Sequence, residues 1–108
     1  MPADMLPDFT NKPTRFVLFH LPGPAWDSSR DTVQQTGIAE HFAYIKGLSE
    51  RGIVFLGGPF LQEMAGGMLI THIGLTDADM QAIIRDDPAV QSGLIRAELR
   101  SWLVTIDS

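Results

Sequence analysis

Cysteine is absent from the 108 residues of this chain, which excludes disulfides, thiolate nucleophiles and sulfur-ligated metal sites. No stretch approaches the roughly 20 apolar residues that a membrane-spanning helix needs. The amino terminus, residues 1–6, has an acidic residue where a signal peptide has basic ones, and no long apolar stretch follows. We therefore expect a soluble protein without a membrane partner, and the cytoplasm as its default location.

Basic residues are also scarce. Only 8 Lys and Arg stand against 13 Asp and Glu, for a formal charge of −5, and a surface of this sign repels a phosphate backbone. We therefore expect no nucleic-acid partner. The sequence also lacks the glycine-rich dinucleotide and phosphate loops and the Gly-x-Ser-x-Gly elbow, so it predicts neither a nucleotide site nor a serine hydrolase. A small anionic ligand stays open, because one cation or a few backbone N–H groups can bind it.

The length suits one domain. Hydrophobic residues make up 44% of the chain and charged residues 19%, which is typical of a globular protein. Residues 1–14 hold three of the seven prolines and show no helical or strand period, so we expect an amino-terminal arm there and a folded domain over 15–108. Any site must then be built from a single core or shared with a second copy of the chain.

The hydrophobic pattern predicts four strands and two helices. The strands are expected at residues 15–20, 53–56, 67–73 and 99–106. The helices are expected at residues 36–51, ended by Gly52, and from Thr76, whose hydroxyl caps the helix, to a stop at Pro88. This β-α-β-β-α-β order is that of a ferredoxin-like α+β sandwich, in which a four-stranded antiparallel sheet has both helices on one face.

The predicted strands are apolar on both faces. The residues assigned to one face are Phe16, Leu18 and Met68, and those assigned to the other are Val17, Phe19 and Leu69. The helices cover one face only, so a second copy is expected to cover the other and form a homodimer. Phe55 and Trp102 are expected to be packing residues.

Two residues are the candidates for catalysis. On a helical wheel His41 falls between Ile45 and Leu48, so its ring points toward the sheet. The spacing alone favours a buried structural histidine, and the alternative is a general acid or base. Asp87 precedes Pro88, which turns it away from the helix. It is either a solvated turn residue or the acceptor that orients His41.

Four further residues are candidates for substrate binding, namely His20, Trp26, Gly58 and Pro59. The Gly-Gly-Pro stretch at 57–59 lets the backbone approach a ligand or a partner chain, or is only the exit of a strand. The indole of Trp26 walls a pocket or folds over the core. A metal set of His20, His41 and His72 is conceivable, but no metal-binding spacing occurs, so we expect no metal and no cofactor.

Taken together, these motifs resemble those of the YCII-related proteins, which are small dimeric α+β barrel domains. The resemblance covers residues 15–104. It rests on the Pro-Gly-Pro-x-Trp turn at 22–26, His41, the Gly-Gly-Pro at 57–59 and the Asp-Pro at 87–88, together with Leu48, Gly52, Gly93 and Trp102. It implies a dimeric α+β barrel in which His41 and Asp87 form the catalytic pair.

The family looks like muconolactone isomerase in fold and includes chloromuconolactone dehalogenases. The resemblance therefore implies a cofactor-independent enzyme in which His41 transfers a proton during isomerisation, elimination or dehalogenation of a lactone-like small molecule. The alternative is a non-catalytic module of the same fold that binds a small molecule or serves as an accessory domain. A longer loop at residues 21–36 than in the shortest family members is expected to change the mouth of the pocket, which leaves the substrate open.

Overall fold

The computed structural model describes residues 11–62 and 65–107 of the chain. They form a four-stranded antiparallel sheet with three α-helices, which confirms the expected α+β class and is compatible with a ferredoxin-like fold. The strand order across the sheet is β2-β3-β1-β4. In chain order the elements are β1 (Thr14–Pro22), a 3-10 helix η2 (Thr32–Gln34), α1 (Ile38–Glu50), β2 (Val54–Pro59), β3 (Gly67–Thr71), α2 (Asp77–Asp86), α3 (Pro88–Gln91) and β4 (Ile95–Leu103).

The expected amino-terminal arm, residues 1–14, lies mostly outside the described residues. Its last residue, Thr14, is the first residue of β1 and pairs with Leu103 of β4, so the sheet starts one residue before the expected boundary. No helix among the described residues combines the length and the apolar character needed to cross a membrane.

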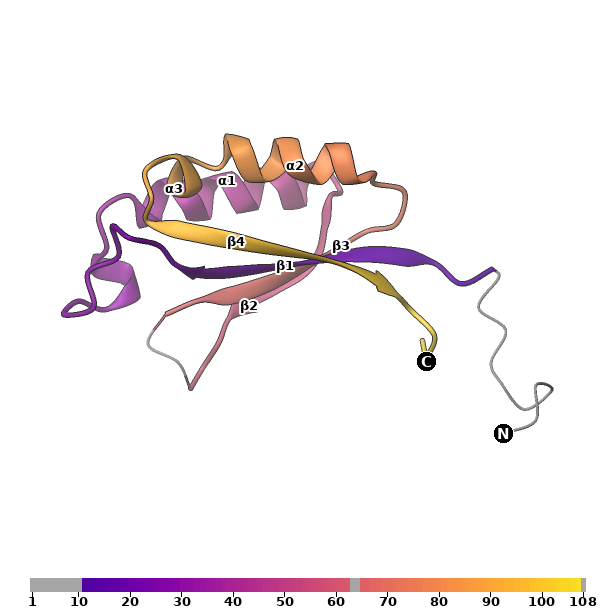
Figure 1. Cartoon of the computed structure of the whole chain (residues 1–108), viewed down its shortest axis with the longest axis horizontal. Coiled ribbons are helices and arrows are strands. Elements are labelled where there is room, and N and C mark those ends of the chain that lie inside the picture. The colour runs from indigo at the N-terminus through magenta and orange to yellow at the C-terminus, as the bar shows by residue number, and fades with distance from the viewer. Residues whose placement is uncertain (1–10, 63–64, 108) are drawn as a thin grey trace.

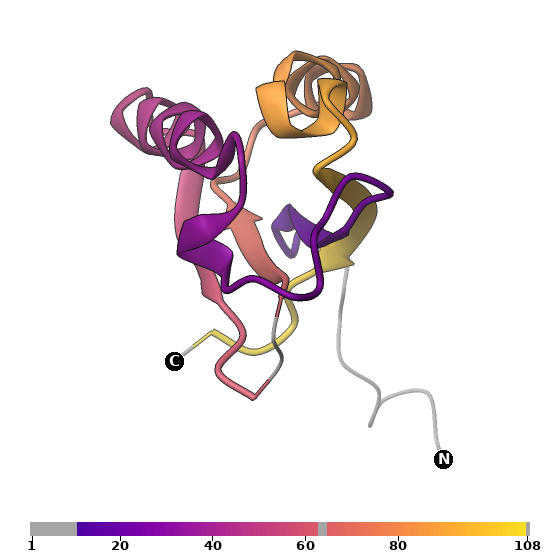
Figure 2. The same ribbon diagram turned by 90° about the vertical axis from the view of Figure 1, so that its left-hand side faces the viewer.

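The helices form one layer and the sheet the other. Figure 1 shows α1, α2 and α3 on the same face of the sheet, and no helix of residues 11–62 and 65–107 covers the opposite face. In the view along the sheet, α1 and α2 lie side by side above it (Figure 2). The side chains that the helices bury against the sheet therefore form the core of the single chain.

Helix α1 turns one side toward the sheet. Its buried residues Ile38, His41 and Leu48 recur at helical spacing, as expected for an amphipathic helix. The helix begins two residues later and ends one residue earlier than the expected span of 36–51. Gly52 follows its end with φ +76°, in the left-handed region that glycine favours, which confirms the expected stop.

Helix α2 starts as expected. The hydroxyl of Thr76 accepts from the backbone N–H of Asp79 at 3.1 Å, and the Asp79 carboxylate accepts from the Thr76 N–H at 2.8 Å. The expected stop at Pro88 is only half right, because Pro88 also begins the short helix α3. Proline suits the first position of a helix, whose N–H has no partner within the helix. Asp87 is the extended residue between the two helices.

The register between β1 and β3 corrects the expected faces. Leu18 pairs with Leu69 and Phe19 pairs with Met68. Leu69 therefore lies under the helices beside Leu18, while Met68 lies on the open face beside Phe19. The expected assignment of Met68 and Leu69 was wrong, because alternation separates two faces within a strand but does not fix how neighbouring strands align.

Strand β4 starts at Ile95 rather than at residue 99 and ends at Leu103 rather than at residue 106. It is an edge strand, and its first half alternates apolar residues with the charged residues Arg96, Glu98 and Arg100. The Glu98 carboxylate pairs with Arg96 at 3.0 Å and with Arg100 at 3.5 Å. The open face is thus apolar over β1 and β3 and charged along β4.

Phe55 and Trp102 are not buried in the single chain, where they are 48% and 41% exposed, so the expected packing role is wrong at this level. Trp102 lies on the open face, around a shallow hollow of about 330 Å³. The apolar residues around this hollow are Val17, Phe19, Met68, Ile70 and Trp102.

Candidate functional site

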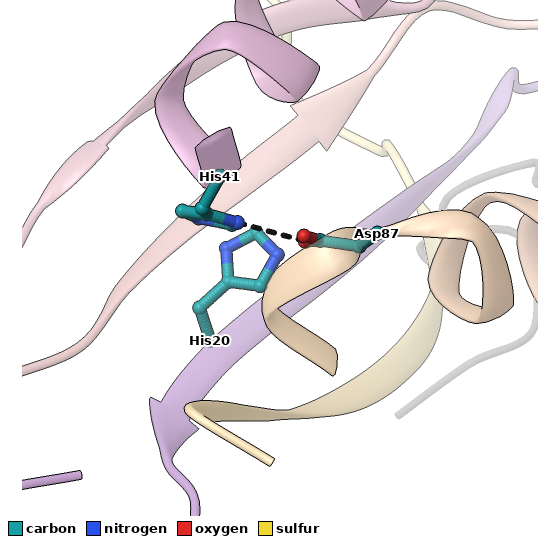
Figure 3. Close-up of side chains that lie close together, drawn as sticks. All are labelled: His20, His41 and Asp87. Atoms are coloured by element: carbon teal, nitrogen blue, oxygen red, sulfur yellow. Dashed lines mark hydrogen bonds and ion pairs between the residues drawn. The ribbon is translucent and has the colours of Figure 1, made fainter. Parts of the chain in front are cut away.

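Three titratable side chains from separate elements meet between the sheet and the helices. His20 comes from β1, His41 from α1 and Asp87 from the junction of α2 and α3 (Figure 3). They are 7%, 5% and 2% exposed. Nδ1 of His41 lies 2.8 Å from Oδ2 of Asp87. The structure thus brings the two candidate catalytic residues into hydrogen-bond contact and adds His20 beside them.

The position of Asp87 between two helices explains this contact. Its Oδ1 accepts the backbone N–H of Ala89 at 2.9 Å and so caps α3, which leaves Oδ2 for His41. A carboxylate can only accept hydrogen bonds, so Nδ1 of His41 carries the hydrogen and donates it. In the neutral ring, Nε2 then has the free lone pair. Of the two readings of Asp87, the solvated turn is therefore wrong for this chain.

A cavity of about 580 Å³ opens beside the histidines. His41, His20, Trp26, Gly58 and Pro59 all line it, whereas Asp87 does not and lies behind His41. The remaining walls are mostly apolar, and the charged residue among them is Lys46, with an exposed side chain. The four residues that the sequence marked for substrate binding thus share one cavity with His41.

Both histidines present free nitrogens to this cavity. Among the described residues, neither Nε2 of His41 nor either ring nitrogen of His20 has a hydrogen-bond partner. No side-chain nitrogen or oxygen of the described residues is both fully enclosed and unpaired, so these ring nitrogens have access to the cavity. Polar ligand atoms can therefore reach both rings.

The two rings differ in their electrostatic surroundings. The pKa of His20 is lowered from 6.5 to about 4, mainly by burial and also by positive charge on His41, while the Asp87 carboxylate opposes both effects. At neutral pH His20 is therefore a neutral imidazole. His41 has the Asp87 carboxylate as a direct partner at 2.8 Å, whereas His20 has no such contact.

The loop between β1 and α1 forms one wall of the cavity. Trp26 packs against the buried cluster that includes Ile38 and Leu94 and also lines the cavity, so both expectations for its indole hold. Sequence reasoning missed Gln35, which is only 4% exposed. Its amide donates to the Asp27 carbonyl at 2.6 Å and accepts from the Asp27 N–H at 2.9 Å, which fixes the residue next to Trp26. No local pattern marks such a glutamine.

The Gly-Gly-Pro strand end forms another wall of the cavity, and here the backbones of β2 and β3 approach each other closely. A Cβ on Gly67 would lie 2.5 Å from the Gly58 carbonyl oxygen and 3.0 Å from Cα of Pro59. A Cβ on Gly58 itself would meet nothing within 4 Å. Gly67 in β3 therefore lets β2 pass close by at the edge of the cavity.

The cluster of His20, His41 and Asp87 also contains the atoms that could bind a metal ion. His20, His41 and Asp87 offer ligand atoms within 4.8 Å of one another, whereas His72 is exposed and meets the ring of Phe55 edge-on, so the conceivable three-histidine set does not form. Both Asp87 oxygens already accept hydrogen bonds, which leaves the two imidazoles as the ligands that face the cavity.

Chemically, the site combines a buried imidazole oriented by a carboxylate with an apolar cavity in front of its free nitrogen. This arrangement suits a general base that acts on a small molecule. In comparisons with known proteins, no family model matches the chain and no curated protein matches it.

Proposed function

We propose that the protein is a cofactor-independent enzyme that moves a proton at a carbon next to a carbonyl group in a small lactone-like molecule. His41 is the general base and Asp87 is the residue that orients it. One observation carries this proposal: Nδ1 of His41 is held by Asp87 at 2.8 Å while the same ring lines the cavity. The resemblance to the YCII-related proteins, with their proposed histidine–aspartate pair, supports the same assignment.

The reaction needs no oxidant and no second substrate. Nε2 of His41 takes the proton from the carbon, and the electron pair of the broken C–H bond moves onto the carbonyl oxygen to form an enolate. The imidazolium is stabilised by Asp87. Return of the proton to another carbon of the enolate gives an isomer. Departure of a leaving group such as halide from the neighbouring carbon instead gives elimination, with the proton left on His41 and later released to water.

The cavity limits the size and the character of the substrate. Its volume of about 580 Å³ lies in the range of small-molecule sites, and its mostly apolar walls favour a compact ring over a chain rich in hydroxyl groups. Lys46, among the lining residues, has an exposed side chain that lies 4.0 Å from the Glu50 carboxylate in a loose surface pair, and a carboxylate on the ligand would compete with Glu50 for this cation. These features suit a small lactone that carries an acidic substituent.

Deuterium exchange tests the proposal without knowledge of the natural substrate. The probe is 5-methyl-2(3H)-furanone, an enol lactone with an acidic C–H next to its carbonyl, followed by proton NMR in D₂O together with a panel of related lactones. We expect the protein to accelerate both exchange and migration of the double bond, and His41→Gln to remove at least about a hundredfold of this acceleration. The matched control is His72→Gln, because His72 is an exposed histidine outside the cavity.

No exchange above the buffer rate with any lactone of the panel would contradict the enzyme proposal. If the lactones still bind, with chemical shift changes that depend on His41, the alternative of a non-catalytic binding module is correct instead.

The second part of the proposal concerns assembly. We propose that two copies pack their open sheet faces together in a homodimeric α+β barrel. The support is the apolar surface over β1 and β3, which includes Phe19 and Met68, together with the half-exposed Trp102 near the end of β4. Exposed apolar patches rimmed by polar residues are typical of such interfaces, and here Arg96, Glu98 and Arg100 form that rim along β4.

A further inference from the structure

His20 has no role in the reaction as described so far, although it is the second histidine of the site. It is only 7% exposed, and among the described residues neither ring nitrogen has a hydrogen-bond partner. Its side chain lines the cavity. A buried polar group without a partner costs free energy, so a ligand that supplies the partner gains from binding here.

The charge state of His20 decides what it can offer. Burial and the neighbouring His41 keep its pKa near 4, so the ring is neutral at neutral pH. A neutral imidazole has one N–H donor. When His41 takes up a proton during the reaction, its positive charge disfavours a second charge on His20 even more. His20 therefore stays a hydrogen-bond donor throughout and does not compete for the proton.

The geometry places this donor next to the base. The two ring centroids are 4.8 Å apart and the ring planes are at 83°, so the two imidazoles stand edge-on to each other (Figure 3), and both line the cavity. In a carbonyl compound, the acidic C–H is on the carbon bonded to the carbonyl carbon, so the hydrogen and the carbonyl oxygen are only a few bonds apart. A ligand whose C–H lies at His41 thus has its oxygen within the reach of His20.

We propose that His20 is a second catalytic residue, whose N–H binds the oxygen on which negative charge develops, and that the cavity prefers planar oxyanions of the enolate and phenolate class. The catalytic half of this inference rests on the proposed function, whereas the binding half does not. The apolar walls strengthen such a hydrogen bond because little water competes for it. The donor is also already in place, so its orientation costs nothing at the moment of reaction.

The test uses 4-nitrophenol, whose ionised form is a planar oxyanion that absorbs at a longer wavelength than the neutral form. Its methyl ether, 4-nitroanisole, has nearly the same shape but cannot ionise. We expect the wild-type protein to bind the phenolate at least about tenfold more tightly than the ether, and to lower the apparent pKa of the bound phenol. Titrations followed by absorbance give both affinities.

Two substitutions separate donation from packing. His20→Phe keeps a flat ring but removes the donor, and we expect it to weaken phenolate binding at least about tenfold while ether binding changes less than twofold. His20→Gln restores an N–H and should recover part of the phenolate preference. The matched control His72→Phe should bind both probes like the wild type. Circular dichroism melting shows whether each variant is folded.

Three results would overturn the proposal: no preference of the wild type for the phenolate, an unchanged preference in His20→Phe, or an equal loss of phenolate and ether binding in both folded His20 variants. The experiment is independent of turnover, because it measures the binding of two probes that do not react. A phenolate preference that depends on His20, found without lactone exchange, would support the oxyanion site and reject the enzyme.

Discussion

The ring of His20 stands edge-on to the ring of His41, with their centroids 4.8 Å apart. Two imidazoles this close in an apolar cavity cannot both carry a charge at low cost. Asp87 makes a hydrogen bond with His41 and none with His20, so the two rings differ in their surroundings. In the proposed reaction His41 is the base, and His20, whose pKa is lowered to about 4, is the neutral hydrogen-bond donor.

This asymmetry predicts how stability depends on pH. The pKa of His20 is 6.5 when it is free and about 4 in the folded protein, so between these values the unfolded chain binds more protons. The free energy of unfolding should therefore fall as pH drops from 6.5 to 4, by an amount on the order of 3 kcal/mol from this residue, and be insensitive to it above 6.5. Urea unfolding at a series of pH values measures the effect.

Other groups titrate in the same window, so a variant isolates the contribution of His20. His20→Gln should lose less stability than the wild type on acidification, whereas His72→Gln, in which an exposed histidine is replaced, should follow the wild type. Parallel pH curves for wild type and His20→Gln would show that the buried ring accepts its proton without cost.

The second prediction concerns Asp87→Asn. The amide can still accept from Ala89 through its oxygen, but its NH₂ group then faces Nδ1 of His41 and favours the tautomer with hydrogen on Nε2. That tautomer cannot act as a base toward the cavity. We expect lactone exchange to fall by about a hundredfold or more, with a much smaller change in melting temperature.

The neighbouring residue provides the control for this substitution. Asp86 is exposed and contacts Arg85 at the surface, so Asp86→Asn should keep wild-type exchange. Wild-type exchange in Asp87→Asn would show that His41 needs no orienting carboxylate and would contradict the assigned role.

The third prediction separates two glycines at the cavity edge. Gly67→Ala places a Cβ against the backbone of β2, at 2.5 Å from the Gly58 carbonyl oxygen, so β2 must shift away and open this wall. We expect a loss of stability of about 1–3 kcal/mol together with weaker 4-nitrophenolate binding. Gly58→Ala has open space around its Cβ and should be tolerated. Equal effects of the two substitutions on melting temperature would contradict the close approach.

Features that depend on neighbours in sequence could be predicted. The capping contact of Thr76, the helix stop at Gly52 and the burial of His41 are confirmed, because each follows from local hydrogen bonding or from helical spacing. Pro88 was harder, since proline both ends one helix and suits the first position of the next. The residue types alone do not decide between these two roles.

Features that depend on how elements align could not be predicted. The alternation of apolar and polar residues within a strand does not determine the register between strands, and it is this register that places Met68 opposite Phe19. Similarly, the contact of His20 with His41 joins a strand and a helix, and it arises only when α1 packs across β1. The candidate residues could therefore be named individually from the sequence, whereas their common cavity and the contrast between the two imidazoles emerged from the fold.

The last prediction concerns the open face of the sheet. If two copies pack these faces together, the protein should scatter light as a particle of twice 11.9 kDa at micromolar concentration. Such an interface should bury more than about 1,000 Å² in total. Phe19→Lys places a charge at its centre and should yield monomers, while Ala43→Lys, on the exposed side of α1, should leave the dimer intact.

Trp102, which is 41% exposed in the single chain, gives a second test of the dimer. If the dimer exists, the loss in free energy of unfolding caused by Trp102→Ala should grow with protein concentration, and if the protein is a monomer it should not. A wild-type protein that is monomeric at micromolar concentration would contradict the proposed assembly and leave Phe19 and Met68 as half-buried residues that no second copy covers.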